Sequence, residues 1–271
     1  MASLGLLAWQ QGRWQLLPPS RCYLLSGSEG SARPLLELML EQPPLRPALD
    51  HLHQAVENDR PSLVHAGGQS WAERLYQQPG FAGRFAAAMD VHSRPAATAW
   101  THPVPLAHHR RLLDVGGGFG THSRAALEAA PGLEAHVLEL PAVVVAAGAQ
   151  ADERLRFASG DLWYDAWPEA DLHFFSDVFH DWPLDRCSQL ARRSFECLPP
   201  RGRIVVHEML LDEDRAGPAA VVANAVSMLL WSEGQQLTAG ELRALLEGAG
   251  FARVRVERTF GCWAIAQGEK P

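Results

Sequence analysis

The glycine-rich segment that follows an apolar run near the middle of the chain constrains the fold most. Residues 112–115 read Leu-Leu-Asp-Val, and glycines follow at 116, 117, 118 and 120. A chain that leaves a buried strand and enters a helix within so few residues needs positive φ angles and close backbone approach, which glycine permits. The segment therefore predicts a nucleotide-like cofactor at a strand-to-helix turn.

The glycine spacing favours one kind of cofactor. A dinucleotide fingerprint G-x-G-x-x-G that began at Gly116 would need its third glycine where Thr121 stands. The pattern G-x-G-x-G, with Gly116 and Gly118 as its first glycines, fits S-adenosylmethionine better than NAD. The next strand-like run ends about 20 residues later at Glu139, whose carboxylate can accept hydrogen bonds from ribose hydroxyls in either cofactor class.

Apolar β-type runs alternate with helical stretches through the rest of the chain. This alternation predicts an α/β fold with a mostly parallel sheet. Only residues 258–261 separate the last two runs, which is too few for a crossover helix, so we expect an antiparallel final strand. The runs are Leu112–Val115, His136–Leu138, Leu155–Ala158, Leu172–Ser176, Ile204–Glu208, Val254–Glu257 and Cys262–Ala266.

The first hundred residues have a different pattern. Residues 6–17 predict a small β-hairpin, and residues 35–100 have helical periodicity that is interrupted at Pro43-Pro44 and Gly67-Gly68. We therefore divide the chain into residues 1–34 with the hairpin, residues 35–105 as a helical region that lines the substrate, and residues 106–271 as the cofactor-binding domain.

Composition excludes several classes of protein. The 271 residues, 47% of them hydrophobic, can bury a large core, and the net charge of −7 argues against nucleic acid or an anionic membrane surface as a partner. The four cysteines form no C-x-x-C pair, so a reducing cytoplasm is expected. The N-terminus has no basic signal-peptide region, and no apolar run reaches the ~18 residues of a membrane span.

Six motifs occur in order along the chain. They are residues 114–120 (DVGGGFG), 138–141 (LELP), 160–162 (GDL), 179–183 (FHDWP), 207–210 (HEML) and 233–238 (EGQQLT). With these motifs, and over residues from about 5 to the C-terminus, the chain resembles the S-adenosylmethionine-dependent small-molecule O-methyltransferases. This family includes plant caffeate and flavonoid enzymes, hydroxyindole O-methyltransferase and bacterial antibiotic enzymes. The resemblance implies a Rossmann-like class I methyltransferase sheet and methyl transfer to a hydroxyl of a small aromatic metabolite.

The resemblance also implies roles for residues at the cofactor. The carboxylate of Asp161 would hold the cofactor near its adenine, and Leu162 would pack on the ring. Ser176 stands where plant relatives have a lysine near the cofactor. From the sequence alone, Gly160-Asp161 is equally consistent with a plain turn.

His180 is the candidate catalytic base, because it follows a β-type run at the strand end where open α/β sheets place ligands. Imidazole, with a pKa of about 6.5, can take the proton of a phenol as its oxygen attacks a methyl group. The resemblance implies that Glu208 orients His180. Asp181 is a further catalytic candidate and is expected to cap the following helix, whereas strand alternation sends His207 to the opposite face, as a packing or surface residue.

The acceptor pocket is expected between residues 65–100 and the helix before Gln236. Phe85, Met89, Met228 and Gln236 are the predicted substrate-binding residues, and an apolar lining suits a flat aromatic acceptor. The other aromatic side chains that are available to line the pocket are more often core than ligand contacts. They are Trp71, Phe81, Phe179 and Trp231.

Two features depart from the family pattern. Gln236 stands where the family commonly has a second glutamate that orients the histidine, and an amide cannot supply that negative charge. Residues 1–34 resemble only the wing of the family's dimerisation and winged-helix region, which weakens the expectation of a homodimer.

Three other functions stay open. The first is C- or N-methylation, including a metal-assisted form with His180 and Asp181 as ligands. The sequence offers no convincing third ligand, although Glu208 is available, so we expect no metal. The second is a binding or regulatory protein without turnover. The third, a nicotinamide oxidoreductase, is disfavoured by Thr121 and would bind NAD in place of S-adenosylhomocysteine.

Overall fold

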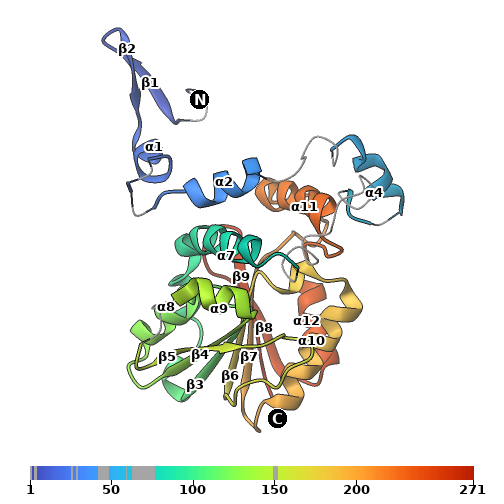
Figure 1. Ribbon diagram of the computed structural model, residues 1–271. Helices are drawn as coiled ribbons and strands as arrows, with labels where there is room; N and C mark the ends of the chain where they lie inside the picture. Colours follow the sequence, from blue (N-terminus) through green and yellow to red (C-terminus); the bar gives the residue numbers. More distant parts are fainter. Residues whose placement is uncertain are drawn as a thin grey trace.

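A seven-stranded sheet forms the centre of the protein, in the computed structural model of the chain (Figure 1). The structure describes residues 2, 5–25, 27–28, 30–41, 49–58, 60–62, 77–148 and 152–271. All seven predicted strand runs are confirmed. The strands are β3 (Arg111–Val115), β4 (Glu134–Glu139), β5 (Leu155–Ser159), β6 (Leu172–Ser176), β7 (Arg203–Met209), β8 (Ala252–Arg258) and β9 (Trp263–Glu269).

The strand order is β5-β4-β3-β6-β7-β9-β8. Strands β3 to β7 are parallel, and β9 pairs antiparallel with both β7 and β8. The predicted antiparallel final strand is therefore confirmed. The chain moves outward from β3 to β5 and then crosses back to β6, so the order reverses between β3 and β6, where open α/β sheets form a crevice at the carboxyl ends of the strands.

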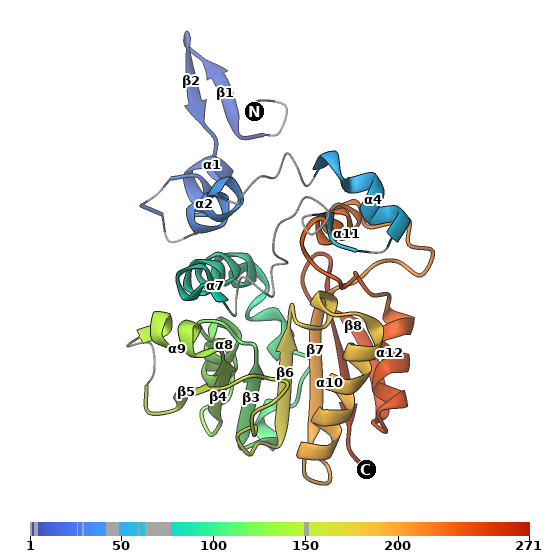
Figure 2. The same cartoon turned by 45° about the vertical axis from the view of Figure 1, so that its right-hand side comes forward.

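Helices cover both faces of the sheet (Figure 2). Adjacent strand residues separate into two cores: Leu113 packs with the helices α10 and α12, and Leu112 packs with α8 on the other face. Trp100 stacks on Phe174 in the second core with a centroid distance of 4.1 Å. These helices and the neighbouring α9 have the bounds α8 Thr121–Ala129, α9 Pro141–Ala147, α10 Leu184–Cys197 and α12 Ala239–Gly248.

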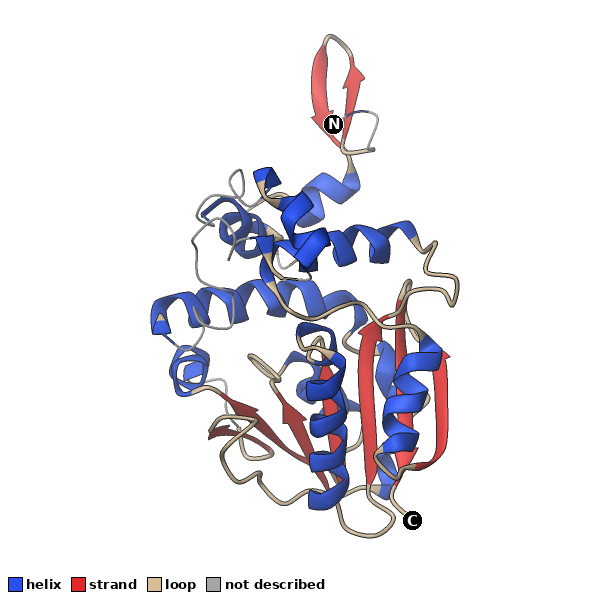
Figure 3. Cartoon of the chain, turned by 90° about the vertical axis from the view of Figure 1, so that its right-hand side faces the viewer, coloured by secondary structure: helices blue, strands red, loops and turns tan. Residues whose placement is uncertain are grey.

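A helical layer lies beyond the carboxyl ends of the parallel strands (Figure 3). It contains α2 (Arg33–Glu41), α4 (Leu52–Asn58), α7 (Pro79–Ser93) and α11 (Ala219–Trp231), so the predicted helical region contains helices. Short 3-10 helices follow α7 and precede α10; the latter, η6, spans Phe179–Asp181. The predicted interruptions at Pro43-Pro44 and Gly67-Gly68, and Trp71, lie outside the described residues.

The predicted N-terminal hairpin is formed by β1 (Leu7–Gln10) and β2 (Arg13–Leu16), and helix α1 (Pro18–Tyr23) follows it. The hairpin extends away from the sheet (Figure 1). Its Trp9 and Trp14 rings meet edge to face at 5.2 Å and are 60% and 58% exposed. Among the residues that the structure describes, none of the helices has the length and hydropathy required to cross a membrane.

Candidate active site

The glycine turn between β3 and α8 has the backbone that its sequence predicts. Gly116, Gly118 and Gly120 have φ angles of +71°, +56° and +78°, which side chains with a Cβ rarely adopt. A Cβ on Gly117 would lie 2.4 Å from Cγ of Asp114. The turn therefore folds directly over the buried Asp114 carboxyl group and needs glycine there for reasons of space.

Glu139 is tied to this turn. Its Oε1 accepts a hydrogen bond from the Gly118 N–H at 3.0 Å, and its Oε2 accepts one from the Leu140 N–H at 2.9 Å. Burial raises the pKa of Glu139, against the lowering effect of these two backbone donors. The end of β4 and the glycine turn thus form one unit, with the carboxylate between them.

A cavity of about 420 Å³ opens beside the glycine turn. It lies at the reversal of strand order between β3 and β6, and helices α2, α7 and α11 contribute to its wall. Ten of the predicted site residues line it, so the fold gathers residues that are up to about 140 positions apart in the sequence. They are Phe85, Met89, Gly116, Gly118, Glu139, Leu162, Ser176, His180, Asp181 and Met228.

Other predicted residues are placed differently. Asp161 is not among the described cavity-lining residues, and its Oδ1 accepts a hydrogen bond from the Trp163 N–H at 2.6 Å, as in a turn. Gln236 is 1% exposed, is not in this lining, and neither atom of its amide has a hydrogen-bond partner. Phe179 is fully buried in the core. The roles given to Asp161 and Gln236 stay predictions.

His180 lies on η6 and is held by Glu208 from the neighbouring strand β7. Nδ1 of His180 is 2.5 Å from Oε2 of Glu208. The other oxygen, Oε1, accepts backbone N–H bonds from Val178 at 3.2 Å and Phe179 at 2.9 Å. Glu208 is 1% exposed, and such a buried carboxylate requires these partners. One side chain therefore fixes both the ring and the turn that carries it.

The charge on His180 is controlled by carboxylates. Burial disfavours the imidazolium, but Glu208, Asp181 and Asp177 together raise the pKa of His180 to about 10. Asp181 Oδ1 lies 3.5 Å from Nε2, and burial raises the pKa of Asp181 to about 7. The prediction that Asp181 caps the next helix is wrong, because Pro183 is the N-cap of α10 and no side chain caps it.

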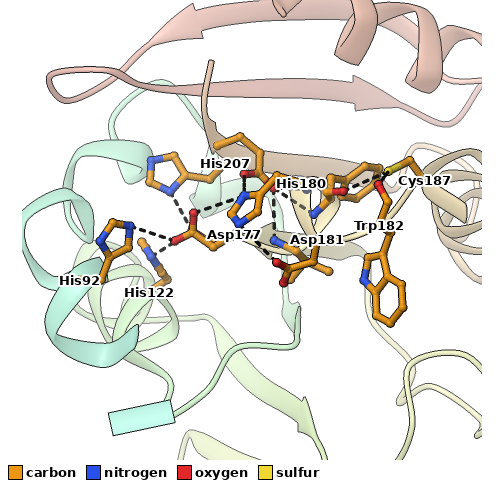
Figure 4. Close-up of polar contacts among 12 residues, drawn as sticks. His92, His122, Asp177, His180, Asp181, Trp182, Cys187 and His207 are labelled. Atoms are coloured by element: carbon orange, nitrogen blue, oxygen red, sulfur yellow. Dashed lines mark hydrogen bonds and ion pairs between the residues drawn. The ribbon is translucent and has the colours of Figure 1, made fainter. Parts of the chain in front are cut away.

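Asp177, which follows β6, is a residue of this site that the sequence analysis did not identify. Its side chain lies between two imidazoles: Oδ2 is 3.6 Å from His92 Nε2, and Oδ1 is 3.7 Å from His180 Nδ1 (Figure 4). It has a positive φ of 56°, and burial raises its pKa to about 6. The available signal was its place at a strand end, three residues before His180.

Ser176 belongs to a buried polar chain under the cavity. Its Oγ lies 3.2 Å from His122 Nε2 and 3.1 Å from His207 Nδ1. His207 is fully buried and stacks on Trp263 with a centroid distance of 4.6 Å. Of the two environments predicted for it, packing or surface, it therefore has the first. Burial lowers the pKa of His122 to about 4 and that of His207 to about 2, so both rings are neutral at pH 7.

Asp177, His180 and Glu208 present ligand atoms within 4.8 Å of one another. This cluster of described residues contains Asp177 in place of Asp181, which the metal alternative had named as a ligand beside His180. However, His180 and backbone N–H groups already occupy both oxygens of Glu208. Hydrogen bonding within the protein therefore accounts for the His180–Glu208 geometry.

Known proteins are similar to this chain in sequence and in fold. A family model described as "O-methyltransferase domain" matches residues 49–252. Acetylserotonin O-methyltransferase of Mus musculus molossinus is 32% identical over 96% of this chain and 71% of its own length. The Bos taurus enzyme is 41% identical over 59% of this chain, and the match spans 46% of the bovine protein.

The crystal structure of human N-acetylserotonin methyltransferase in complex with SAM (S-adenosylmethionine) superposes with a TM-score of 0.90 and 28% identity, covering 99% of this chain and 80% of that one. The sheet with its reversed last strands is therefore the fold of class I methyltransferases. Within that class, the chain belongs to the O-methyltransferase domain family.

Proposed function

We propose that the chain catalyses S-adenosylmethionine-dependent methyl transfer to a hydroxyl group of a small aromatic molecule. The observation that carries the proposal is a histidine, held by a buried glutamate, that lines the same cavity as the glycine turn. The relatives named for acetylserotonin support an aromatic hydroxyl acceptor.

The cavity fits this cofactor. Glu139, at the end of β4, and the glycine turn would hold its ribose and amino-acid portions, and Leu138, Leu140 and Leu162 offer an apolar surface for a base. Oδ1 of Asp114 is buried without a hydrogen-bond partner. A bound cofactor with a hydrogen-bond donor near the glycine turn would satisfy this oxygen. S-adenosylmethionine, when bound, supplies a methyl group on a sulfonium centre.

His180 acts as the general base in this proposal. In the neutral ring Nδ1–H donates to Glu208. Nε2, which lies 3.5 Å from Asp181 Oδ1, is then the nitrogen that accepts the proton of the acceptor hydroxyl. A pKa of about 10 for His180 is close to that of a phenol, about 10, so proton transfer between the two groups is nearly balanced. The cavity walls position the hydroxyl oxygen, which is the main source of rate enhancement in such a displacement.

Phe85, Met89 and Met228 form the apolar wall against which a flat acceptor would pack. The chain division at residues 34 and 105, a homodimer, a cytoplasmic location and the exclusion of nucleic acid stay predictions from the sequence. Side chains of Trp71 and Trp231 lie outside the described residues.

Calorimetry with S-adenosylhomocysteine, together with a methylation assay on a panel of phenols and hydroxyindoles, tests the proposal. We expect wild type and His180→Ala to bind S-adenosylhomocysteine equally well. Methyl transfer should fall roughly 10²- to 10⁴-fold in His180→Ala, as for loss of a general base. A folded wild type that does not bind S-adenosylhomocysteine, or an H180A variant that retains full turnover, would refute the proposal.

A further inference from the structure

The described residues that line the cavity include many acidic side chains and neither lysine nor arginine. Five of the described lining residues carry carboxyl groups, Asp90, Asp114, Glu139, Asp177 and Asp181, and none of the described lining residues is lysine or arginine. The basic side chains among them are imidazoles, and that of His180 is already paired with Glu208 and Asp181. An acceptor that brought its own carboxylate would therefore have to compete with these carboxyl groups for a cation. Juxtaposed like charges are strongly unfavourable at a desolvated interface.

Three of these carboxyl groups already have partners inside the protein. Asp90 pairs with Arg94 at 2.6 Å, Asp114 accepts a hydrogen bond from Ser123 at 2.7 Å, and Glu139 accepts two backbone N–H bonds. Asp181 lies beside Nε2 of His180, where the acceptor hydroxyl reacts. Asp177 remains, and its Oδ1 lies 3.7 Å from Nδ1 of His180, the ring nitrogen that faces Glu208 and not the acceptor hydroxyl.

Asp177 lacks any hydrogen bond to its side chain. Neither oxygen has a hydrogen-bond partner, although the side chain is only 11% exposed and lines the cavity. The charged or titratable groups that face it are His92 from α7, His180 from η6 and Glu208 from β7. The two imidazoles stand at 3.6 and 3.7 Å, beyond hydrogen-bond distance.

The backbone at Asp177 is also held in an unusual state. Its φ of 56° is in the left-handed region, and its N–H donates to the His207 carbonyl at 3.2 Å. Such strained residues persist where surrounding structure enforces them, often at ligand sites. The strain and the unsatisfied carboxyl oxygens are two independent observations at one residue, and a buried acceptor without a donor is costly unless a ligand supplies one.

We propose that Asp177 determines acceptor specificity, by accepting a hydrogen bond from an N–H or ammonium group of an uncharged or cationic aromatic substrate. Carboxylate-bearing acceptors are excluded by the same residue. This inference rests on the proposed methyltransferase function, and it names the class of acceptor that the cavity selects.

Four matched phenols test the inference: 4-hydroxyphenylacetamide, 4-hydroxyphenethylamine, methyl 4-hydroxyphenylacetate and 4-hydroxyphenylacetate. Their affinities are measured by calorimetry on the protein saturated with S-adenosylhomocysteine, and their methylation is assayed in parallel. We expect the amide and the amine to bind at least about tenfold more tightly than the ester and the carboxylate, which corresponds to about 1.4 kcal/mol.

Asp177→Asn and Asp177→Gly are the informative variants, because asparagine and glycine tolerate a left-handed backbone. Both should reduce the amide-to-carboxylate affinity ratio at least tenfold, with S-adenosylhomocysteine binding retained. Asp212→Asn removes one negative charge at an exposed pair with Arg258 and should leave the ratio unchanged.

The outcomes are distinguishable. Equal binding of carboxylate and amide by wild type, an unchanged ratio in both Asp177 variants, or no binding of the amide and the amine overturns the inference. Loss of S-adenosylhomocysteine binding in the Asp177 variants also overturns it, because the carboxylate would then serve the cofactor. Selective binding without methylation of any probe would instead contradict the proposed function.

Discussion

The protonation state of His180 determines what this site can do at a given pH. Burial alone would keep the ring neutral, but the three nearby carboxylates outweigh it and raise the pKa of His180 to about 10. A protonated imidazole cannot accept the hydroxyl proton, so the active form is the minor form at neutral pH. The carboxylates that orient the base also make it stronger, at the cost of a lower active fraction.

This balance predicts an alkaline pH profile. Methyl transfer by the wild type should rise with pH towards about 10, because the pKa of His180 is raised to that value. Glu208→Gln removes the largest cause that raises it, so the rising limb should move to lower pH by roughly 1–3 units. Initial rates with one phenol between pH 6 and 10.5 measure this.

Glu169→Gln, a change at a side chain that is 92% exposed, serves as the control and should keep the wild-type profile. If the limb of Glu208→Gln coincides with that of wild type, His180 is not the titrating base. If it moves to higher pH, the sign of the electrostatic argument is wrong.

At the level of elements, the site depends on two places where the backbone of a glycine lies too close to another group for a Cβ to fit. The first is Gly117, in the turn over Asp114. Gly117→Ala would place Cβ 2.4 Å from Cγ of Asp114, so the turn must move and the Gly118–Glu139 hydrogen bond must change. We expect at least about a tenfold loss of S-adenosylhomocysteine affinity, as when about 1.4 kcal/mol is lost. Gly132→Ala meets no atom within 4 Å and should bind normally; equal affinities would contradict the argument.

The second place is Gly234, where the loop before α12 packs against η6, the turn that carries His180. A Cβ on Gly234 would lie 2.0 Å from the His180 carbonyl oxygen, so Gly234→Ala should displace η6. We expect methyl transfer to fall at least about tenfold, because small misplacements of catalytic groups are costly. S-adenosylhomocysteine binding should persist, since the glycine turn is elsewhere. A variant with weakened cofactor binding and normal turnover at saturation would contradict this argument, because Gly234 would then support the cofactor site and not the position of His180.

The strands were predictable because their apolar runs are short, buried and regularly spaced, as in β6 at Leu172–Ser176. The contact between His180 and Glu208 was implied by the family resemblance, and its structural reason is that β6 and β7 are neighbours in the sheet. Gln236 was not predictable in the same way, because a loop residue's direction depends on contacts such as that of Gly234 with η6. Asp177 was missed because neither its positive φ nor its missing hydrogen bonds can be read from sequence.

For the molecule as a whole, buried histidines make stability depend on pH. Burial lowers the pKa of His122 to about 4, of His173 to about 3 and of His207 to about 2. The unfolded chain binds protons at these residues below about pH 6.5, whereas the folded protein does not, so they reduce stability as pH falls. Buried Asp114 and Asp181, with pKa values raised to about 7, act in the opposite direction, because the folded protein takes up their protons first.

Comparing His207→Gln with wild type isolates the contribution of His207 to the pH dependence of stability, because the buried carboxyl groups are the same in both proteins. His207 is fully buried, and its ring nitrogens lie 3.1 Å from Ser176 Oγ and 3.3 Å from Thr259 Oγ1. His207→Gln should be less stable than wild type at pH 7.5 through lost packing. The gap should narrow by about 2 kcal/mol at pH 5, because only the wild type has an unfolded state stabilised by protonation of this residue. Urea unfolding of both proteins at several pH values measures the gap. A constant gap would show that the folded protein protonates His207 over the same pH range as the unfolded chain, and a gap that widens towards pH 5 would show that it does so more readily. In either case the neutral hydrogen-bonded chain beneath the cavity would have to be reassigned.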